Sequence, residues 1–520
     1  MSKQTFLQGT FILIIAGLIT KILGFVNKIV VARIMGEEGV GLYMMAVPTL
    51  LLVITLTRLG LPVAISKLVA EAEAEKDYKK MKRVLLVSLS ITIMLSIIFT
   101  SALFLTAPIL SQTLLTDERT FYPLIAIAPV VPIVALSSVL RGYFQGRQNM
   151  RPSAYSQVIE QVVRITLVAM LTSLFLPYGI EFAAAGAMVS VVIGELASLL
   201  FLFSMFKFKK QFKLRTGFWH HITSGKKTLN EILGIALPTT GSQLIGSISY
   251  FLEPIVVARS LYIAGVASHE ATKQYGELAG LAIPLLLLPT FVTFAISTSL
   301  VPAISEAAAQ KHYRTIDYRL NQALRLAMIS GGISVVITYI FAVPIMELMY
   351  DAPTVASYVK IMSPFFFFLY FQAPLAAALQ ALDLAKAAMI NSLIGAVVKT
   401  AAIFALAANP DFGIIGAGLA ITSGIVLVTM LHFATILKAI PFTIIVRDYI
   451  KGFIAIIATG CAASFLYHHS LLKVNLLVDT VFSISMTVLF YFIFSMLIGI
   501  IKNEDLQPIP VIGKWFQNKK

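Results

Sequence analysis

Long apolar stretches, separated by short polar breaks, recur along the whole chain from Phe11 to Ile501. Each has the length of an α-helix that crosses the hydrocarbon core of a bilayer, about 20 residues. The pattern therefore predicts an all-α, polytopic membrane protein with about fourteen transmembrane helices. These helices are expected at residues 8–34, 41–68, 84–110, 121–144, 154–176, 183–206, 229–257, 275–304, 321–348, 357–381, 385–408, 413–437, 447–467 and 475–501.

The composition fits a lipid environment, because 58% of the 520 residues are hydrophobic, 12% are charged and the mean hydropathy is +0.88. The net charge is +15, but the cations lie in short loops rather than on one soluble face, so nucleic-acid binding is not expected. Lys and Arg in or beside the N-terminus, the even-numbered loops and the C-terminus number 27, against six in or beside the odd-numbered loops. This bias predicts a protein of the cytoplasmic (inner) membrane with both termini in the cytoplasm.

Enzymatic chemistry is not expected from this chain. Cys461 is the only cysteine, which excludes an intrachain disulfide and a thiolate metal cluster. Gly225-Lys226 lacks the upstream glycine and the following hydroxyl of a nucleotide-binding P-loop. No metal, cofactor or catalytic group is therefore predicted, and His220-His221 has no suitably spaced ligand companion.

An internal repeat divides the chain into two halves. The motif Ile-Val-Val-Ala-Arg at residues 29–33 returns at 255–259, and Ala-Ile-Ser at 64–66 returns at 303–305. Six helices per half is an even number, so the two lobes are expected to insert with the same orientation. The predicted parts are an N-lobe at 1–206, a basic cytoplasmic connector on anionic lipid at 207–228, a C-lobe at 229–438, and helices 13 and 14 with a cytoplasmic tail at 439–520.

Cations inside the predicted helices are the strongest functional signal. Lys21 and Lys28 are seven residues apart and share one face of the first helix. Arg58 lies just before Gly60-Leu61-Pro62, a sequence that favours a bend, and Arg164 lies in the fifth helix. A charge at the bilayer centre costs about 2.5 to 3.5 kcal/mol, so these four residues predict a watery cavity or an anionic ligand.

The acids of the first half are fewer, chiefly Glu160 and Glu195, and this imbalance favours an anionic substrate such as a pyrophosphate. A structural alternative is that Arg164 is satisfied by Glu160 at the i, i+4 position of the same helix. Arg33 and Arg259 are interpreted as side chains that snorkel at helix ends.

In the second half, a coupling-ion site for Na⁺ or H⁺ is predicted at Glu253 and Asn391. Glu253 precedes Pro254, whose ring frees a backbone carbonyl, and an alternative is that Glu253 pairs with Lys399. The eighth helix carries three prolines and is expected to be a bent gate element, or simply a kinked packing helix.

The duplicated six-helix lobe, the two trailing helices and the run from Leu23-Gly24-Phe25 to Gly36 resemble the multidrug/oligosaccharidyl-lipid/polysaccharide exporter superfamily. Within it, the chain resembles the polysaccharide-transport branch, and the run 36–43 resembles a branch found in spore-forming bacteria. The resemblance implies a carrier similar to MurJ-type lipid II flippases that serves peptidoglycan synthesis, with the spore cortex as product. Of the flippase pattern around the first helix, Lys21 matches, whereas Asn27-Lys28 stands where that pattern has Arg-Asp.

These observations lead to one leading hypothesis. Lys21, Lys28, Arg58 and Arg164 would bind the pyrophosphate of an undecaprenyl-linked cell-wall precursor, and the lobes would move it across the membrane by alternating access. One alternative is a multidrug or cation antiporter of the same fold. The other is a membrane scaffold that recruits cell-wall synthases without transporting anything.

Overall fold

The computed structural model describes residues 6–209, 226–469 and 475–502, so the predicted connector and the C-terminal tail lie largely outside the described residues. The described residues are mostly helical and contain no strands. Thirteen helices within them are long and apolar enough to cross a membrane. The first of these candidates runs over 60 residues, about 90 Å of helix, which is enough for two crossings, so the prediction of about fourteen spans is confirmed.

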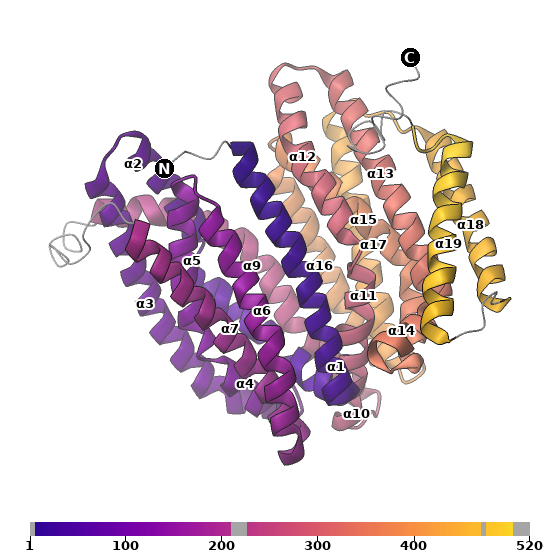
Figure 1. Cartoon of the computed structure of the whole chain (residues 1–520), viewed down its shortest axis with the longest axis horizontal. Coiled ribbons are helices and arrows are strands. Elements are labelled where there is room, and N and C mark those ends of the chain that lie inside the picture. Colours follow the sequence, from indigo (N-terminus) through magenta and orange to yellow (C-terminus); the bar gives the residue numbers. More distant parts are fainter. Residues whose placement is uncertain (1–5, 210–225, 470–474, 503–520) are drawn as a thin grey trace. The chain divides into compact units, whose positions relative to one another are not determined.

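The α-helices cover the predicted ranges, but several ends are shifted. In chain order they are α1 (Phe6–Arg58), α2 (Leu61–Ala74), α3 (Tyr78–Ile109), α4 (Phe121–Ile127), α5 (Val130–Gly146), α6 (Arg151–Phe175), α7 (Ile180–Lys209), α9 (Lys226–Ile263), α10 (Ser268–Tyr275), α11 (Ile283–Leu287), α12 (Thr290–Ala309), α13 (Tyr313–Ile340), α14 (Ala342–Tyr350), α15 (Ala356–Ala381), α16 (Ala385–Ala407), α17 (Gly413–Ala439), α18 (Val446–His468) and α19 (Leu476–Ile498). Four short helices, α4, α10, α11 and α14, were not predicted as separate elements. Figure 1 shows α18 and α19 running side by side.

The helical segment at residues 6–74 is interrupted at two places. Gly36, with φ 67° and ψ −175°, divides α1 into the two predicted crossings. The second crossing ends at Arg58 rather than at the predicted residue 68, because Leu59 and Gly60 have φ of 44° and 61° and α2 starts afresh with a proline in its first turn. A Cβ at Gly60 would lie 2.6 Å from the carbonyl oxygen of Ala236, so only glycine fits there. The bend predicted at Gly60-Leu61-Pro62 is confirmed.

The predicted fourth and eighth helices are also interrupted. The former is divided into α4 and α5 just before Val130. The latter consists of a π-helical turn at Gly276–Ala282, α11, and α12 after Pro289, as its prolines predicted. By contrast, α9 continues as one helix through Pro254.

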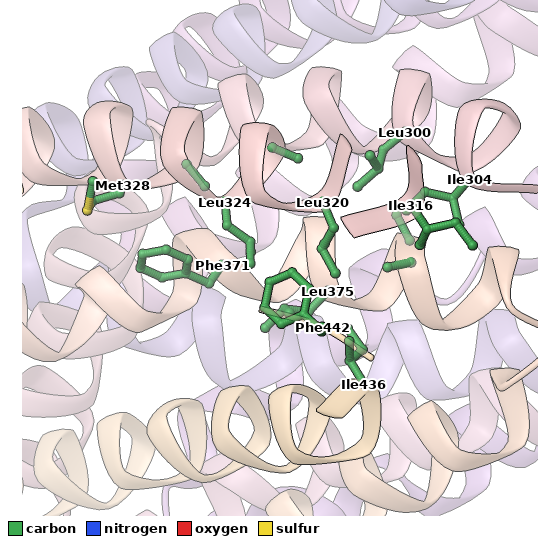
Figure 2. Close-up of a cluster of buried hydrophobic side chains, with 14 of the residues drawn as sticks. Leu300, Ile304, Ile316, Leu320, Leu324, Met328, Phe371, Leu375, Ile436 and Phe442 are labelled. Atoms are coloured by element: carbon green, nitrogen blue, oxygen red, sulfur yellow. The ribbon is translucent and has the colours of Figure 1, made fainter. Parts of the chain in front are cut away.

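The chain forms two compact units, which are described separately. Unit 1 comprises residues 1–281 and 400–417, and unit 2 comprises residues 282–399 and 418–520. In unit 1, apolar side chains of α2, α3, α5, α7 and α9 form a buried cluster that includes Ile65, Tyr143 and Ile232. In unit 2, α12, α13 and α15 pack around Leu324, Phe371 and their neighbours, as Figure 2 shows. The predicted lobe boundaries remain a prediction.

Beside the Gly36 break, polar side chains of α1, of α10 and of the segment before α4 bind one another. Asp117 accepts hydrogen bonds from Arg119 Nη2 at 2.8 Å and from Thr272 Oγ1 of α10 at 2.7 Å. Arg119 also pairs with Glu38, and Lys273 Nζ lies 3.3 Å from Glu37 Oε2. Hydrogen bonding to Glu37 raises the pKa of Lys273 above its ordinary value. These contacts hold α10 and the segment before α4 against the part of α1 that follows the Gly36 break.

Asp117 is the centre of this network. Burial acts to raise the pKa of Asp117, but hydrogen bonds from Arg119 and Thr272 outweigh burial and hold that pKa below its ordinary value. The carboxylate therefore stabilises the fold above its unfolded pKa, and this contribution is lost as the pH falls through its folded pKa.

We expect the Asp117→Asn substitution to lower the free energy of unfolding at neutral pH by about 2 kcal/mol, because charge-assisted hydrogen bonds are lost. Thermal unfolding of the purified protein between about pH 3 and pH 7 measures the effect. The variant should lose less stability on acidification than the parent chain. Glu118→Gln, which alters an exposed neighbouring carboxylate, is the control. Equal midpoints and equal pH dependence in the parent and Asp117→Asn would contradict this role.

Candidate functional site

Unit 1 contains a cavity of about 340 Å³ whose wall combines apolar side chains with five charged ones. The wall is built by α1, α4, α5, α6 and α7. Its charged residues are Arg58, Arg141, Glu160, Arg164 and Glu195. Three arginines against two glutamates give the wall a formal excess of one positive charge.

The second crossing of α1 forms one side of the cavity. Tyr43, Val47, Leu50, Leu51, Ile54 and Arg58 all line it. Apart from the adjacent Leu50 and Leu51, successive residues are three or four apart, which places all six on one face of the helix. The distance along the axis from Tyr43 to Arg58 is about 22 Å, so this face extends over most of the hydrocarbon core.

Arg164 is held by a neighbouring helix rather than by its own. Its Nη2 donates a hydrogen bond of 2.8 Å to the hydroxyl oxygen of Tyr43 on α1. Glu160 interacts electrostatically with Arg164 within α6, but no ion pair joins their side chains among the described residues, so Glu160 alone does not satisfy Arg164 as the predicted alternative required. Glu160 instead forms its ion pair with Arg141 of α5, because that guanidinium enters between α6 and α7.

Arg141 is the charged residue that sequence reasoning missed as part of the site. Its Nη2 lies 3.4 Å from Glu160 Oε2, 3.4 Å from Glu195 Oε1 and 2.9 Å from Ser198 Oγ. Arg141 is five residues before the end of α5, a position typical of a snorkelling anchor, and this hid its role. The available signal was an arginine in an apolar segment of a lobe that already holds several such cations.

Close packing of α6 and α7 brings the two carboxylates together. A Cβ at Gly194 would lie 2.9 Å from the carbonyl oxygen of Glu160, so glycine permits this approach. The next residue, Glu195, is 3% exposed and is thereby placed beside Glu160. The Glu195 carboxyl group lies within hydrogen-bonding reach of the Glu160 carboxyl group.

The four predicted substrate-binding cations are only partly brought together. Arg58 and Arg164 line the same cavity. Lys28 lies outside its wall but interacts electrostatically with Arg164. Lys21, two turns earlier on α1, is exposed and does not contribute to the wall. Between the two lysines, Gly24 approaches Gln161 of α6, since a Cβ there would lie 4.0 Å from Gln161 Oε1.

The two residues of the predicted coupling-ion site belong to different units. Glu253 is buried in α9 of unit 1, where Tyr250 and Tyr275 interact with it electrostatically. Asn391 of unit 2 donates a hydrogen bond of 2.9 Å to Thr435 Oγ1 and lies 3.2 Å from His432 Nδ1. The site that combines them remains a prediction.

The cavity is chemically suited to an anion. Arg58, Arg141 and Arg164 each have a buried Nε without a hydrogen-bond partner among the described residues. Guanidinium groups match phosphate oxygens with paired, charge-assisted hydrogen bonds. No group of three or more metal-ligating side chains occurs in the part of the chain that the structure describes.

Comparison with known proteins gives consistent matches. The family model described as "Polysaccharide biosynthesis protein" matches residues 6–308, and the MatE model matches residues 277–404. Stage V sporulation protein B of Bacillus subtilis (strain 168) is 56% identical over 514 residues, which cover 99% of both chains. Lipid II flippase MurJ of the same organism is 26% identical over 416 residues, which cover 76% of each chain.

Solved structures of low sequence identity share the fold. The inward closed conformation of lipid II flippase MurJ has a TM-score of 0.71 at 17% identity, covering 93% of this chain and 97% of that one. The inward-facing conformation of a multidrug resistance MATE family transporter has a TM-score of 0.65 at 16% identity, covering 80% and 93%. The predicted polytopic exporter fold is confirmed.

The different partners of Arg141 and Arg58 lead to different expected effects on stability. Arg141→Gln should lower the free energy of unfolding by about 3 kcal/mol, because it leaves Glu160 and Glu195 buried without their countercharge. Arg58→Gln should cost less, because Arg58 interacts electrostatically with Glu195 and Glu160 but forms no ion pair among the described residues. Thermal unfolding of both variants in one detergent measures the difference. Equal losses would show that Arg141 has no special structural role.

Proposed function

The chain belongs to the polysaccharide biosynthesis protein family, and from that premise we propose that it is a flippase for an undecaprenyl-pyrophosphate-linked cell-wall precursor. The proposed substrate is lipid II for spore cortex peptidoglycan, moved across the cytoplasmic membrane by alternating access. Both termini would face the cytoplasm, as the distribution of Lys and Arg predicts. The chain is a multi-pass membrane transport protein and not an enzyme.

The observation that carries this proposal is the arginine-lined cavity of unit 1. Arg58, Arg141 and Arg164 come from three helices and border one space of about 340 Å³. Guanidinium groups there can donate several hydrogen bonds to the oxygens of one pyrophosphate, while the polyprenyl tail stays in lipid. The excess of positive charge disfavours a cationic drug as the substrate.

The names of the relatives agree with this chemistry. The relatives include a sporulation protein at 56% identity and a lipid II flippase at 26% identity. Lipid II carries a pyrophosphate between its lipid and its sugar, which is the anion that the cavity is suited to hold.

Lys21 and Lys28 would act outside the cavity wall. They share one face of the first crossing, and the electrostatic interaction of Lys28 with Arg164 of the cavity wall supports this role. We propose that the two lysines attract the headgroup before it reaches the arginines, because a line of cations raises the local concentration of an anion.

The membrane potential can contribute to the driving force. Moving one elementary charge across it is worth about 2.3 kcal/mol per 100 mV, and a negative interior favours outward movement of an anionic headgroup. Glu253 and Asn391 remain the proposed residues for a coupling ion, either Na⁺ or H⁺.

The Arg58→Gln variant tests the proposal. Loss of one charge-assisted contact should weaken lipid II binding by about 1.5 to 3 kcal/mol, or roughly 10- to 100-fold. Binding and flipping are measured in proteoliposomes with fluorescent lipid II.

Arg33→Gln is the matched control, because it removes an exposed cation from the same helix outside the cavity wall. The control should keep parental binding and flipping. If Arg58→Gln bound and flipped lipid II as well as Arg33→Gln, the cavity would not be the headgroup site.

A further inference from the structure

We infer that Glu160 and Glu195 form a proton-binding pair, which takes up one proton when an anionic headgroup occupies the arginine cavity. The inference rests on the proposed function and deepens it, because it assigns a second ligand to the same cavity. The pair lies within unit 1 and is distinct from the predicted coupling-ion residues Glu253 and Asn391.

The geometry around Arg141 is the first reason. One guanidinium nitrogen of Arg141 is 3.4 Å from a carboxylate oxygen of Glu160 and 3.4 Å from one of Glu195. Both distances are at the outer limit of a hydrogen bond, and the same nitrogen donates its shorter bond, of 2.9 Å, to Ser198. A single guanidinium is therefore shared by two carboxylates and engages neither of them closely.

The closeness of the two carboxyl groups is the second reason. They lie within hydrogen-bonding reach of each other, and the side chains of Glu160 and Glu195 are 17% and 4% exposed. Like charges at such a distance in a poorly solvated site repel, and a proton shared between the two oxygens removes the repulsion. Because the two carboxylates share only one ion-pair partner, Arg141, they can together accept one proton.

The charged side chains of the surrounding helices determine the net charge around the glutamate pair. Arg58 and Tyr43 face the cavity from α1, Arg141 from α5 and Arg164 from α6, whereas α4 contributes an apolar side chain. Lys28 acts on Arg164 from the first crossing. The wall itself holds one more positive than negative charge.

A bound headgroup changes this balance. A pyrophosphate diester brings about two negative charges, roughly one per phosphate. Added to the wall, it leaves an excess of one negative charge, which one proton on the glutamate pair neutralises. A neutral site costs less than a charged one when the cavity is closed to water. Headgroup binding and proton binding therefore strengthen each other, and this linkage is reciprocal.

Movement of Arg141 also favours proton binding when the headgroup is bound. When its guanidinium turns toward the phosphate oxygens, Glu160 and Glu195 lose the countercharge that they share. A proton then takes its place between them. A sodium ion fits this position less well, because the three arginines of the wall repel it whereas a proton becomes part of a neutral carboxyl group.

The test is lipid II binding to the full chain in nanodiscs, measured between about pH 5.5 and pH 8.5. Because the complex holds more protons than the free protein, the affinity should fall as the pH rises, by up to about tenfold per pH unit for one proton. The pyrophosphate diester does not titrate in this range. A pH-indicator dye in weak buffer should report proton uptake on lipid II binding.

Glu160→Gln and Glu195→Gln are the informative variants, since an amide imitates the protonated carboxyl group without titrating. Either variant should bind lipid II with an affinity that no longer depends on pH and equals the low-pH value of the parent chain. Glu181→Gln, on the same helix as Glu195 but outside the cavity wall, should keep the parental pH dependence.

The outcomes separate this inference from the proposed function. Tight lipid II binding by the parent chain that is independent of pH, with no proton uptake, would overturn the proton site and leave the flippase intact. Retention of the pH dependence in both glutamine variants would do the same. Absence of lipid II binding at every pH would overturn both. Since proton uptake is measured on the parent chain, the inference is tested even if a variant does not fold.

Discussion

Charged side chains are costly inside a membrane, and this cost governs how the cavity of unit 1 is built. A guanidinium costs about 2.5 to 3.5 kcal/mol at the bilayer centre and less towards a helix end, and unit 1 carries three around one cavity. A bundle of transmembrane helices without a ligand site would gain no stability from these arginines. The cavity, the glutamates that share Arg141 and the hydroxyl that binds Arg164 together reduce this cost, and the Nε of each guanidinium keeps no hydrogen-bond partner among the described residues.

The backbone of unit 1 is arranged to build that cavity. The Gly36 break returns the chain into the bilayer, and the second crossing then presents one face from Tyr43 to Arg58. The positive φ values at Leu59 and Gly60 end this crossing at Arg58. On the opposite side, Gly194 lets α7 approach α6 closely enough to place Glu195 beside Glu160. Backbone geometry, rather than the residue types alone, therefore determines which charges meet.

The sequence predicted the spans and the bends well, because each depends on local properties of the chain. Apolar length determined the crossings, and Gly60-Leu61-Pro62 and the prolines near residue 289 marked the interruptions. Arg58 and Arg164 were recognised as functional candidates, because a charge in an apolar run is visible without a structure. These two residues do line one cavity.

The pairing of the charges could not be predicted from local spacing. The i, i+4 relation of Glu160 and Arg164 suggested an intrahelical pair, yet each side chain reaches a different helix. Arg141 resembled a helix-end anchor, because its two acidic partners are 19 and 54 residues away. The hydrogen bond from Thr272 to Asp117 similarly joins α10 to a segment that only tertiary packing brings beside it.

Whether the arginines of unit 1 bind the pyrophosphate of a lipid-linked precursor can be decided by a structure of the chain in nanodiscs with bound lipid II. We expect phosphate density in the cavity, with oxygens within hydrogen-bonding distance of the guanidinium groups of Arg58 and Arg164, about 3 Å. Density for the headgroup at another place, with this cavity containing only water, would contradict this expectation.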